Sequence, residues 1–172
     1  MVTSDPSGSI APGDFRTALG RFASGITIMS TLQGGVAHAM TANAFTSVSL
    51  DPPLVLVCVD KGVRMHDAVL ECGFWAVSVL GSSQEAIAER FAKSGRDLLT
   101  QFDGIGTAPG PKTGCPVIGG ALSWLECRTW ATYDGGDHTI VVGEVLSLGA
   151  EGVVDPAALI YYAGHYRELR GN

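Results

Sequence analysis

The chain has 172 residues, of which 46% are hydrophobic and 16% are charged. A chain of this length buries about two-thirds of its unfolded surface when it folds as one domain. Its net charge of −6, and the absence of any run among its 11 Lys and Arg residues, argue against nucleic acid and anionic membranes as partners. No apolar run approaches the roughly 20 residues of a membrane helix, so we expect no membrane association.

The N-terminal sequence MVTSDPSGSIAPGD has neither the basic segment nor the apolar core of a signal peptide. We expect residues 1–13 to form a flexible arm and residues 14–172 to form a single domain in the cytoplasm. The four cysteines are widely spaced without a C-x-x-C pair, which favours buried free thiols. The four histidines are isolated from one another, so no metal site is predicted.

The first predicted elements are a helix and a hairpin. Asp14 can act as N-cap of a helix whose apolar residues recur every three or four positions, and Gly25 is placed to end it. The apolar segments 26–32 and 36–42 flank a Gly-Gly pair, a pattern typical of a β-hairpin with a tight turn.

The stretch MTANAFTSVSLDPPLVLV, residues 40–57, has an unusual distribution of hydroxyl groups. Successive side chains of a strand point to opposite faces. This alternation predicts one face that is polar except for a phenylalanine ring, and a second face that is dry. The polar face comprises Asn43, Phe45, Ser47 and Ser49, and the dry face comprises Ala44, Thr46, Val48 and Leu50. One interpretation is a half-solvated strand. The other is a groove whose small side chains let a phosphorylated ligand lie against the backbone.

The middle of the chain alternates helices and strands. After the turn at Pro52-Pro53, residues 54–59 form a strand that is apolar on both faces. A helix is predicted over 63–73, closed by a glycine, and a strand over 74–80. Ser82 and Glu85 form a capping-box pattern that opens a helix ending at Gly95. Residues 97–114 are expected to form an excursion or lid loop.

The C-terminal third is predicted to be mainly strand. Two long strands, 121–133 and 138–148, are joined by a Gly-Gly turn, and the tail supplies one further short strand. The count of about eight strands and three helices without regular alternation favours an antiparallel barrel over a doubly wound parallel sheet. No G-x-G-x-x-G motif opens a helix and no P-loop is present.

The sequence shows no catalytic motif of the acid–base or nucleophilic kind. Glu144 lies in an apolar strand and is either a buried carboxylate or the partner of an arginine at the rim of the barrel. Trp124 and Trp130 are expected in the core or at an interface. The chain is therefore either a binding module or an enzyme whose chemistry is supplied by a cofactor.

Five segments together resemble the short-chain flavin reductase family, the reductase components of two-component flavin-dependent monooxygenases. In chain order they are MTANAFTSVSLDPPLVLVCVDK, GFWAVSVL, ERFAKSG, WLECRTWATYDGGDHTIVVGEV and YYAGHYREL. The most specific are the first segment and GDHTIVVGEV, and the resemblance extends from about Phe15 to Leu169.

The resemblance implies a mainly β fold, an FMN-binding split β-barrel that is antiparallel and Greek-key-like with about three peripheral helices. It also implies a homodimer that reduces FMN or FAD with NADH or NADPH, by hydride transfer from nicotinamide C4 to flavin N5. The reduced flavin would go to a partner monooxygenase. This reaction needs stacked rings and no protein nucleophile, which agrees with the absence of a catalytic triad.

The resemblance also implies site residues. The flavin ring would lie along Met40, Thr41, Ala42 and Asn43, and the ribityl chain and phosphate along Ser47, Val48 and Ser49. An adjacent wall would be formed by Cys58, Val59, Asp60 and Lys61, and the phosphate end would be closed by Phe91 and Lys93. His138, beside Asp137, would contact the nicotinamide as the catalytic residue, or else be a turn histidine that bonds to its own loop. The nicotinamide side would be bordered by Gly164, Tyr166 and Arg167.

Two other proteins on the same barrel remain as alternatives. One is a flavin- or haem-binding carrier without catalytic activity, which would need no nicotinamide-contacting histidine. The other is an enzyme like pyridoxamine-phosphate oxidase, although the phosphate-binding arginines expected there are not visible. Gly62-Val63 departs from the family pattern, in which a hydroxyl residue is common, and this leaves the choice between FMN and FAD open.

Overall fold

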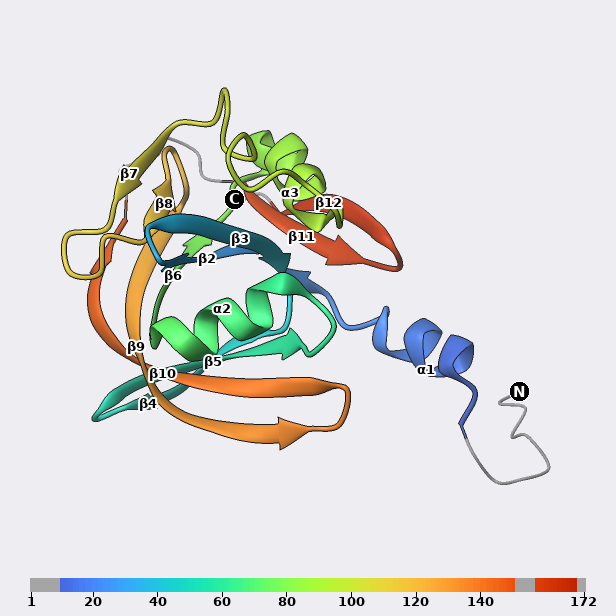
Figure 1. The fold of residues 1–172 in the computed structure, drawn as a ribbon. Helices are drawn as coiled ribbons and strands as arrows, with labels where there is room; N and C mark the ends of the chain where they lie inside the picture. Colours follow the sequence, from blue (N-terminus) through green and yellow to red (C-terminus); the bar gives the residue numbers. More distant parts are fainter. Residues whose placement is uncertain (1–9, 151–156, 170–172) are drawn as a thin grey trace.

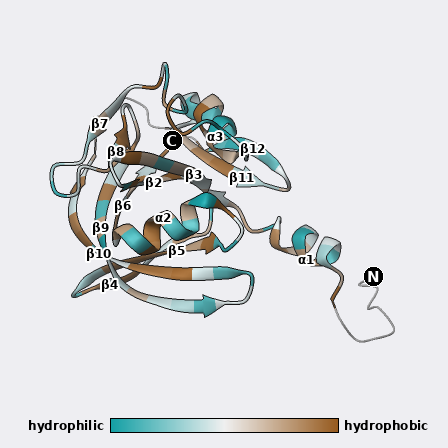
Figure 2. Cartoon of the chain, viewed as in Figure 1, coloured by the Kyte–Doolittle hydropathy of each residue, from teal (hydrophilic) through white to brown (hydrophobic). Residues whose placement is uncertain are grey.

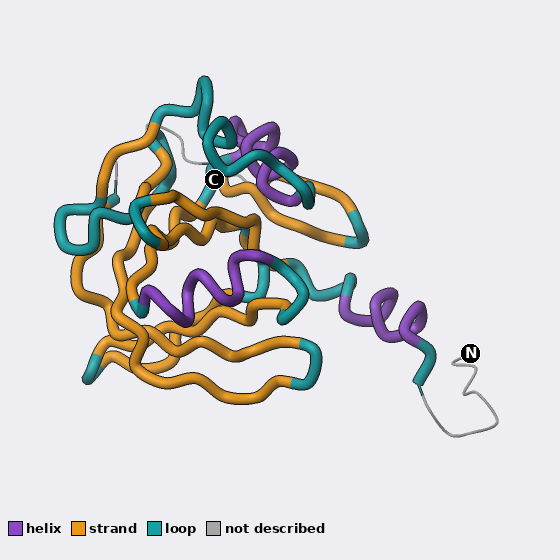
Figure 3. The backbone as a smooth tube through the Cα atoms, in the orientation of Figure 1, coloured by secondary structure: helices purple, strands orange, loops and turns teal. Residues whose placement is uncertain are grey.

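A computed structural model describes residues 10–150 and 157–169 of the chain. Residues 1–9 of the predicted arm lie outside this part, and the first helix already begins at Pro12. Three α-helices and one 3₁₀ helix are present among the described residues (Figures 1 and 3): α1 Pro12–Leu19, α2 Arg64–Cys72, η1 Ser82–Gln84 and α3 Glu85–Ala92.

Seven strands form one antiparallel sheet in the order β3-β2-β6-β9-β10-β5-β4. Their bounds are β2 Thr27–Gln33, β3 Val36–Ala42, β4 Phe45–Leu50, β5 Pro53–Asp60, β6 Phe74–Val79, β9 Ser123–Gly135 and β10 His138–Gly149. The predicted hairpin at Gly34–Gly35 joins β2 to β3, and both glycines have positive φ. The mainly β, antiparallel fold is therefore confirmed.

The sheet curves around its main core. Met29 of β2 shares one buried cluster with Val57 of β5, from the opposite half of the strand order, and with Trp75 of β6. Helix α2 contributes Met65 and Val69 to this cluster and lies within the curve of the sheet in Figure 1. This arrangement is consistent with a split barrel.

A second core lies between the barrel and α3. It joins Ile28, Ala88, Phe91 and Leu159, with Tyr166 packed against it. A three-stranded sheet β1-β11-β12 covers this side, formed by β1 Ser24–Gly25, β11 Ala158–Tyr162 and β12 His165–Leu169. In Figure 2 hydrophobic stretches are visible on β3, β10 and β11, strands that border the two cores.

The strand count differs from the sequence prediction for local reasons. The tail forms a hairpin of two strands because Ala163 and Gly164 adopt positive φ and turn the chain. The predicted loop 97–114 contains β7 Thr107–Pro109, which pairs with β8 Pro116–Ile118. Such short pairings carry too few apolar positions for a periodic signal.

The predicted boundaries of two helices, α1 and α3, are corrected at both ends. Helix α1 ends at Leu19, with Gly20 as C-cap, and Gly25 lies in β1; Ala11 is the N-cap and Asp14 makes no capping bond. The Ser82–Glu85 capping box is also wrong, because the Gly81 N–H donates to the Gln84 side chain at 3.1 Å. Helix α3 ends at Ala92, before the expected Gly95.

The prediction of a dry face on the strand 43–50 was wrong for the single chain. A β-bulge shifts the register between Ser47 and Ser49, which breaks the alternation. Val48 is 49% exposed and Leu50 is 95% exposed, whereas Phe45 packs against the main core. The strand lies at the edge of the sheet, and within residues 10–150 and 157–169 most of its side chains are exposed.

None of the helices in the described part of the chain has the length and apolar character needed to cross a bilayer. The described residues also contain no cluster of three or more His, Cys, Asp or Glu side chains placed to hold a metal ion.

Candidate functional site

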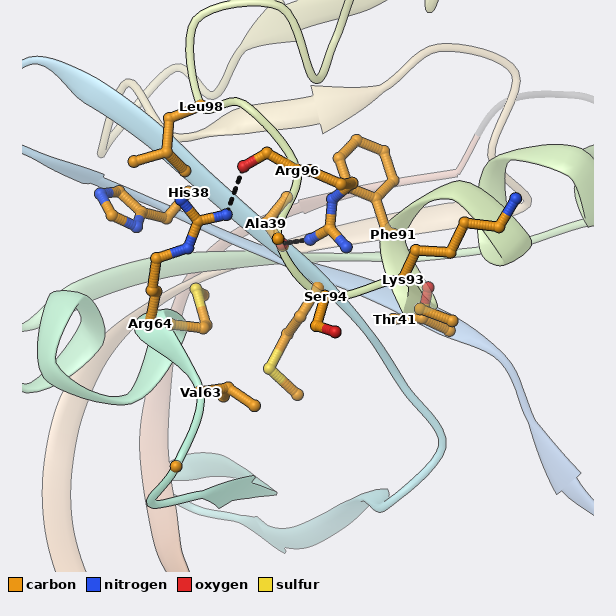
Figure 4. Close-up of a pocket in the computed structure, with 15 residues that line it drawn as sticks. His38, Ala39, Thr41, Val63, Arg64, Phe91, Lys93, Ser94, Arg96 and Leu98 are labelled. Atoms are coloured by element: carbon orange, nitrogen blue, oxygen red, sulfur yellow. Dashed lines mark hydrogen bonds between the residues drawn. The ribbon is translucent and has the colours of Figure 1, made fainter.

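A cavity of about 430 Å³ lies between β3, the N-terminus of α2 and the segment that follows α3 (Figure 4). Its wall consists of 15 residues: His38, Ala39, Met40, Thr41, Gly62, Val63, Arg64, Met65, Phe91, Ala92, Lys93, Ser94, Gly95, Arg96 and Leu98. A cavity of this volume is within the range of small-molecule sites.

The charge of the wall is entirely positive. It contains Arg64, Lys93 and Arg96 and no carboxylate, in a chain that has 17 Asp and Glu residues. Clustered cations without counter-charges favour an anionic ligand, and guanidinium and ammonium groups form strong hydrogen bonds with phosphate oxygens.

Arg64 and Arg96 are held in place by backbone carbonyls. Arg64 Nη2 donates to the carbonyl of Arg96, and Arg96 Nη2 donates to the carbonyl of Ala39 at 2.8 Å. The Arg96 guanidinium lies 5.4 Å from the centroid of the Phe91 ring, a cation–π contact. Burial and then the Arg64 charge lower the pKa of Arg96, and its buried Nε has no hydrogen-bond partner among the residues that the structure describes.

His38 adds a buried polar group to the wall. It is 7% exposed, and its Nδ1 has no hydrogen-bond partner among the described residues. Burial and then the nearby Arg64 lower the pKa of His38, which favours the neutral form of the ring. The adjacent N-terminus of α2 has no side-chain cap, since Val63 occupies the N-cap position. The His66 N–H of the first turn donates to the Val63 carbonyl at 3.0 Å, which leaves the Arg64 and Met65 N–H groups at the open end of the helix.

Side chains fasten the cavity wall to the outer edge of β3. Gln101 Nε2 donates to the carbonyl of Ala37 at 2.7 Å, next to the Arg96 bond to Ala39. Thr41 Oγ1 donates to the carbonyl of Ala88 in α3 at 2.6 Å. These contacts place the segment after α3 over β3 and so create the cavity.

Four of the sequence-predicted residues lie in this cavity: Met40, Thr41, Phe91 and Lys93. The next two predicted residues, Ala42 and Asn43, follow Thr41 in the chain but do not line the cavity. Ala42 belongs to the main core, and Asn43 is exposed, with its Nδ2 3.3 Å from Ser24 Oγ. The N–H of Cys58 bonds to the carbonyl of Ala44 at 3.0 Å, which joins β5 to this segment.

A second group of predicted residues meets at the end of β5 and the turn between β9 and β10. The Lys61 N–H donates to the carbonyl of Asp137 at 3.0 Å, and Lys61 Nζ bonds to Asp134. His138 pairs in register with Asp60, and its Nδ1 lies 2.7 Å from Asp137 Oδ1.

The electrostatics of this turn are set by its ion pairs. The hydrogen bond and charge of Lys61 lower the pKa of Asp134, and those of His138 lower the pKa of Asp137. Val59, which was assigned to the same wall, lies wholly in the main core.

The remaining predicted residues lie elsewhere. Ser47, Val48 and Ser49 are on the edge strand β4, and Gly164, Tyr166 and Arg167 are on the β11–β12 hairpin. The Tyr166 ring packs edge-on against Tyr161 with centroids 5.5 Å apart, and burial raises the pKa of Tyr166.

Sequence reasoning named four of the fifteen wall residues and missed the other eleven, among them His38, Arg64 and Arg96. The signal that could have found the arginines is their position: Arg64 is the first residue of a helix, and Arg96 follows the glycine after another helix. Their convergence depends on how the segment after α3 folds over β3, which local patterns do not reveal.

In the described part of the chain, Glu126 and not Glu144 is the buried carboxylate. Glu126 is 0% exposed and accepts hydrogen bonds from the N–H groups of Lys112 and Thr113 and from the Thr113 hydroxyl, at 2.7–3.1 Å. Glu144 pairs with Arg128 at 2.6 Å, the rim pairing that was the other interpretation.

Comparison with known proteins gives one consistent result. A family model described as "Flavin reductase like domain" matches residues 19–170. An NADH-dependent FAD reductase from Streptomyces globisporus is 42% identical over 150 residues, covering 85% of this chain and 82% of the relative. The reductase component of a 4-hydroxyphenylacetate 3-monooxygenase from Thermus thermophilus is 40% identical, covering 90% of this chain and 95% of the relative.

Solved structures agree with these sequence matches. BorF, the flavin reductase component of a bacterial two-component tryptophan halogenase, superposes with a TM-score of 0.87 at 44% identity, covering 94% of this chain and 100% of BorF. The NADH:FAD oxidoreductase SgcE6 of Streptomyces globisporus, in complex with NAD and FAD fragments, has a TM-score of 0.87 at 38% identity, covering 97% and 96% of the two chains.

Proposed function

The chain belongs to the flavin reductase like family, and from this premise we propose that it is an NADH-dependent reductase of FAD or FMN. The observation that carries the proposal is the cavity beside β3, whose wall has three cations and no carboxylate. A flavin nucleotide carries a phosphate that such a wall attracts. The hydride moves between NADH and the flavin, so the protein has only to bind and orient the two molecules.

The cavity supports one placement of the flavin phosphate. Phe91 and Lys93, which the family resemblance implies for the phosphate end, line the same wall as Thr41, which it implies for the flavin ring. The Lys93 ammonium would pair with the phosphate, and the Ser94 hydroxyl beside it can donate a further hydrogen bond. The flavin ring would then follow β3 through Thr41 toward Asn43.

His138 is proposed to contact the nicotinamide. Its Nδ1–H donates to the Asp137 carboxylate, and its Nε2 makes no other hydrogen bond within the described part of the chain. Asp137 therefore fixes the orientation of the ring and leaves Nε2 free for the carboxamide of NADH. Gly164, Tyr166 and Arg167 would border this side on the β11–β12 hairpin.

The proposed partners are a second copy of the chain and a monooxygenase. Helix α1 has no buried residue, and Phe15 and Leu19 are each 55% exposed, which supports a homodimer that covers them. Several relatives are reductase components of two-component monooxygenases, and this supports delivery of reduced flavin to such an enzyme. Free cysteines, four among the described residues, agree with a reducing compartment such as the cytoplasm.

The test is NADH oxidation at 340 nm with FAD, FMN and riboflavin compared at equal concentrations. We expect turnover that scales with added flavin, with riboflavin having the highest KM because it lacks a phosphate. Flavin that stays bound through gel filtration without any NADH oxidation would contradict the reductase and favour a carrier.

A further inference from the structure

One short segment, residues 61–66, leads from β5 into the first turn of α2 and connects two regions of the candidate site. Its middle residues 62–64 line the cavity beside β3. The N–H of its first residue, Lys61, donates to the carbonyl of Asp137 at 3.0 Å, in the turn that precedes His138. The segment therefore contacts both the cavity and the turn that carries the proposed nicotinamide contact.

His66 makes the buried contact between this segment and β10. Its Nε2 lies 2.9 Å from the Thr139 hydroxyl, and its Nδ1 lies 2.8 Å from the Asp67 carboxylate. Because a carboxylate only accepts hydrogen bonds, Nδ1 is the donor, and Nε2 of the neutral ring accepts from Thr139. The His66 side chain is 14% exposed and Thr139 is 8% exposed, so water competes little for this bond.

Thr139 is the next residue after His138 and is held by both neighbouring strands. It pairs in register with Val59 of β5 and with Asp134 of β9. Successive side chains of a strand point to opposite faces, so Thr139 points toward α2 while the partly exposed His138 points to the other face. A displacement of Thr139 therefore moves the backbone that carries His138.

The side-chain contacts of Lys61 with the same turn are more exposed. Lys61 Nζ donates to the carbonyl of Gly136 at 2.6 Å and bonds to Asp134, and both Lys61 and Asp134 are exposed. Exposed ion pairs contribute little to stability and are weakened by salt. Among the described side chains, His66 thus provides the buried polar contact that fixes Thr139 from the side of α2.

We propose that His66 is a positioning residue for hydride transfer, which acts through Thr139 to hold His138 where its Nε2 meets the nicotinamide carboxamide. The inference rests on the proposed function, which assigns that contact to His138. A displacement of about 1 Å in a group that orients a substrate can lower the rate strongly. Neither His66 nor Thr139 lines the cavity beside β3, so flavin affinity should not depend on their hydrogen bond.

The test is the kcat/KM for NADH, measured at 340 nm with saturating FMN. Thr139→Val removes the hydroxyl and keeps the shape of the side chain, and it should lower kcat/KM about tenfold. His66→Ala removes the acceptor and should have the same effect. Thr139→Ser and His66→Gln each keep a polar group for the bond and should recover part of the activity. The Kd for FMN, measured by fluorescence titration, should stay unchanged in all four variants.

A double variant separates positioning from a merely structural role. A positioning residue acts only through His138, so Thr139→Val added to His138→Gln should lower kcat/KM no more than about twofold further. A structural role would give the same loss in both backgrounds. If Thr139→Val does not fold, as judged by thermal melting, His66→Ala takes its place in the same cycle.

Thr129→Val is the matched control on the neighbouring strand β9. It removes a threonine hydroxyl that accepts a hydrogen bond from Trp75 Nε1 at 3.2 Å and that makes no contact with the turn before His138. The kcat/KM for NADH should therefore stay at the wild-type value in this variant.

Three results would overturn the proposal. The first is a wild-type kcat/KM for NADH in Thr139→Val and His66→Ala, and the second is an equal loss in the presence and absence of His138→Gln. The third is a weakening of FMN by the same factor as kcat/KM. An unchanged kcat/KM in His138→Gln would overturn both the proposal and the role of His138, whereas a wild type without any NADH oxidation would refute the proposed function itself.

Discussion

Two serines of β4 have hydroxyl groups whose presence the fold does not explain. Ser47 is exposed and Ser49 is half-buried, and neither hydroxyl makes a hydrogen bond within the described residues. In contrast, Thr27 and Thr31 of β2 each donate to a backbone carbonyl and stabilise the barrel. Serines on an edge strand whose hydroxyl groups make no hydrogen bond within the fold are candidates for ligand contacts.

We predict that Ser47→Ala combined with Ser49→Ala weakens flavin binding by about 1–3 kcal/mol, through lost hydrogen bonds to the flavin. The midpoint of urea unfolding should stay unchanged, because no hydrogen bond of the fold is removed. Fluorescence titration with FMN and FAD measures the affinity. An equal loss of stability and affinity would show that the serines are structural.

The cysteines differ strongly in their surroundings. Burial, followed by the nearby Glu126 carboxylate, raises the pKa of Cys127 to about 12, and burial also raises the pKa of Cys115. Cys58 and Cys72 are partly exposed. A thiol whose pKa is raised stays protonated at pH 8 and is a poor nucleophile.

We therefore predict that at most two thiols, Cys58 and Cys72, react with Ellman's reagent in the native protein at pH 8. All four should react after unfolding in guanidinium chloride. The Cys58→Ser and Cys72→Ser double variant should show no fast reaction, and fast labelling of that variant would contradict the burial of Cys115 and Cys127.

At the level of elements, predictions succeeded where the signal was local. The hairpin at Gly34–Gly35 and the buried stripe of α2, closed by Gly73 with a φ of 69°, follow directly from turn glycines and periodicity. The faces of β4 were misassigned because a bulge breaks the alternation, and no residue type marks that bulge.

The candidate site was predictable only in part, for a related reason. Thr41, Phe91 and Lys93 belong to motifs that the family resemblance identifies. Arg64 and Arg96 reach the same cavity through hydrogen bonds to carbonyls distant in sequence, so their proximity is a property of tertiary structure. A pattern within either segment contains no information about the other.

Glu126 fastens the loop before β8 to the barrel. Its carboxylate accepts bonds from Lys112 and Thr113 while wholly buried, and a Cβ on Gly110 would lie only 2.1 Å from its Oε1. The close approach requires glycine at position 110, and the loop depends on the charge of Glu126 for its hydrogen bonds.

We predict that Glu126→Gln lowers the free energy of unfolding by about 1–3 kcal/mol, because the amide replaces one acceptor oxygen with a donor that faces N–H groups. Chemical denaturation measures the change. Glu144→Gln is the matched control and should cost no more than about 1 kcal/mol, since it removes a partly exposed ion pair. Equal effects would contradict the role of Glu126 as an anchor.

At the scale of the whole molecule, α1 extends from the body in Figure 1. An isolated helix of eight residues is not stable in water, and the exposed side chains of Phe15 and Leu19 on α1, with Phe22 just after it, make this segment an unusual surface element. The exposed Val48 and Leu50 of β4 add to the apolar surface of the single chain. A second copy of the chain would bury such surface.

We predict that the wild type elutes as a dimer, at about twice the 17.9 kDa mass of the chain, in size-exclusion chromatography with light scattering. Phe15→Ser combined with Leu19→Ser should shift it toward the monomer, by removing apolar contacts. Arg16→Gln on the same helix should not. A monomeric wild type would contradict the dimer.

Two side chains occupy backbone carbonyls along the outer edge of β3, and this affects how the edge can pair with other molecules. An edge strand with open carbonyls can template pairing with strands of other molecules, which leads to aggregation. Here the carbonyls of Ala37 and Ala39 are already occupied by the side chains of Gln101 and Arg96. The same contacts that shape the cavity therefore also protect this edge of the sheet from strand-to-strand self-association.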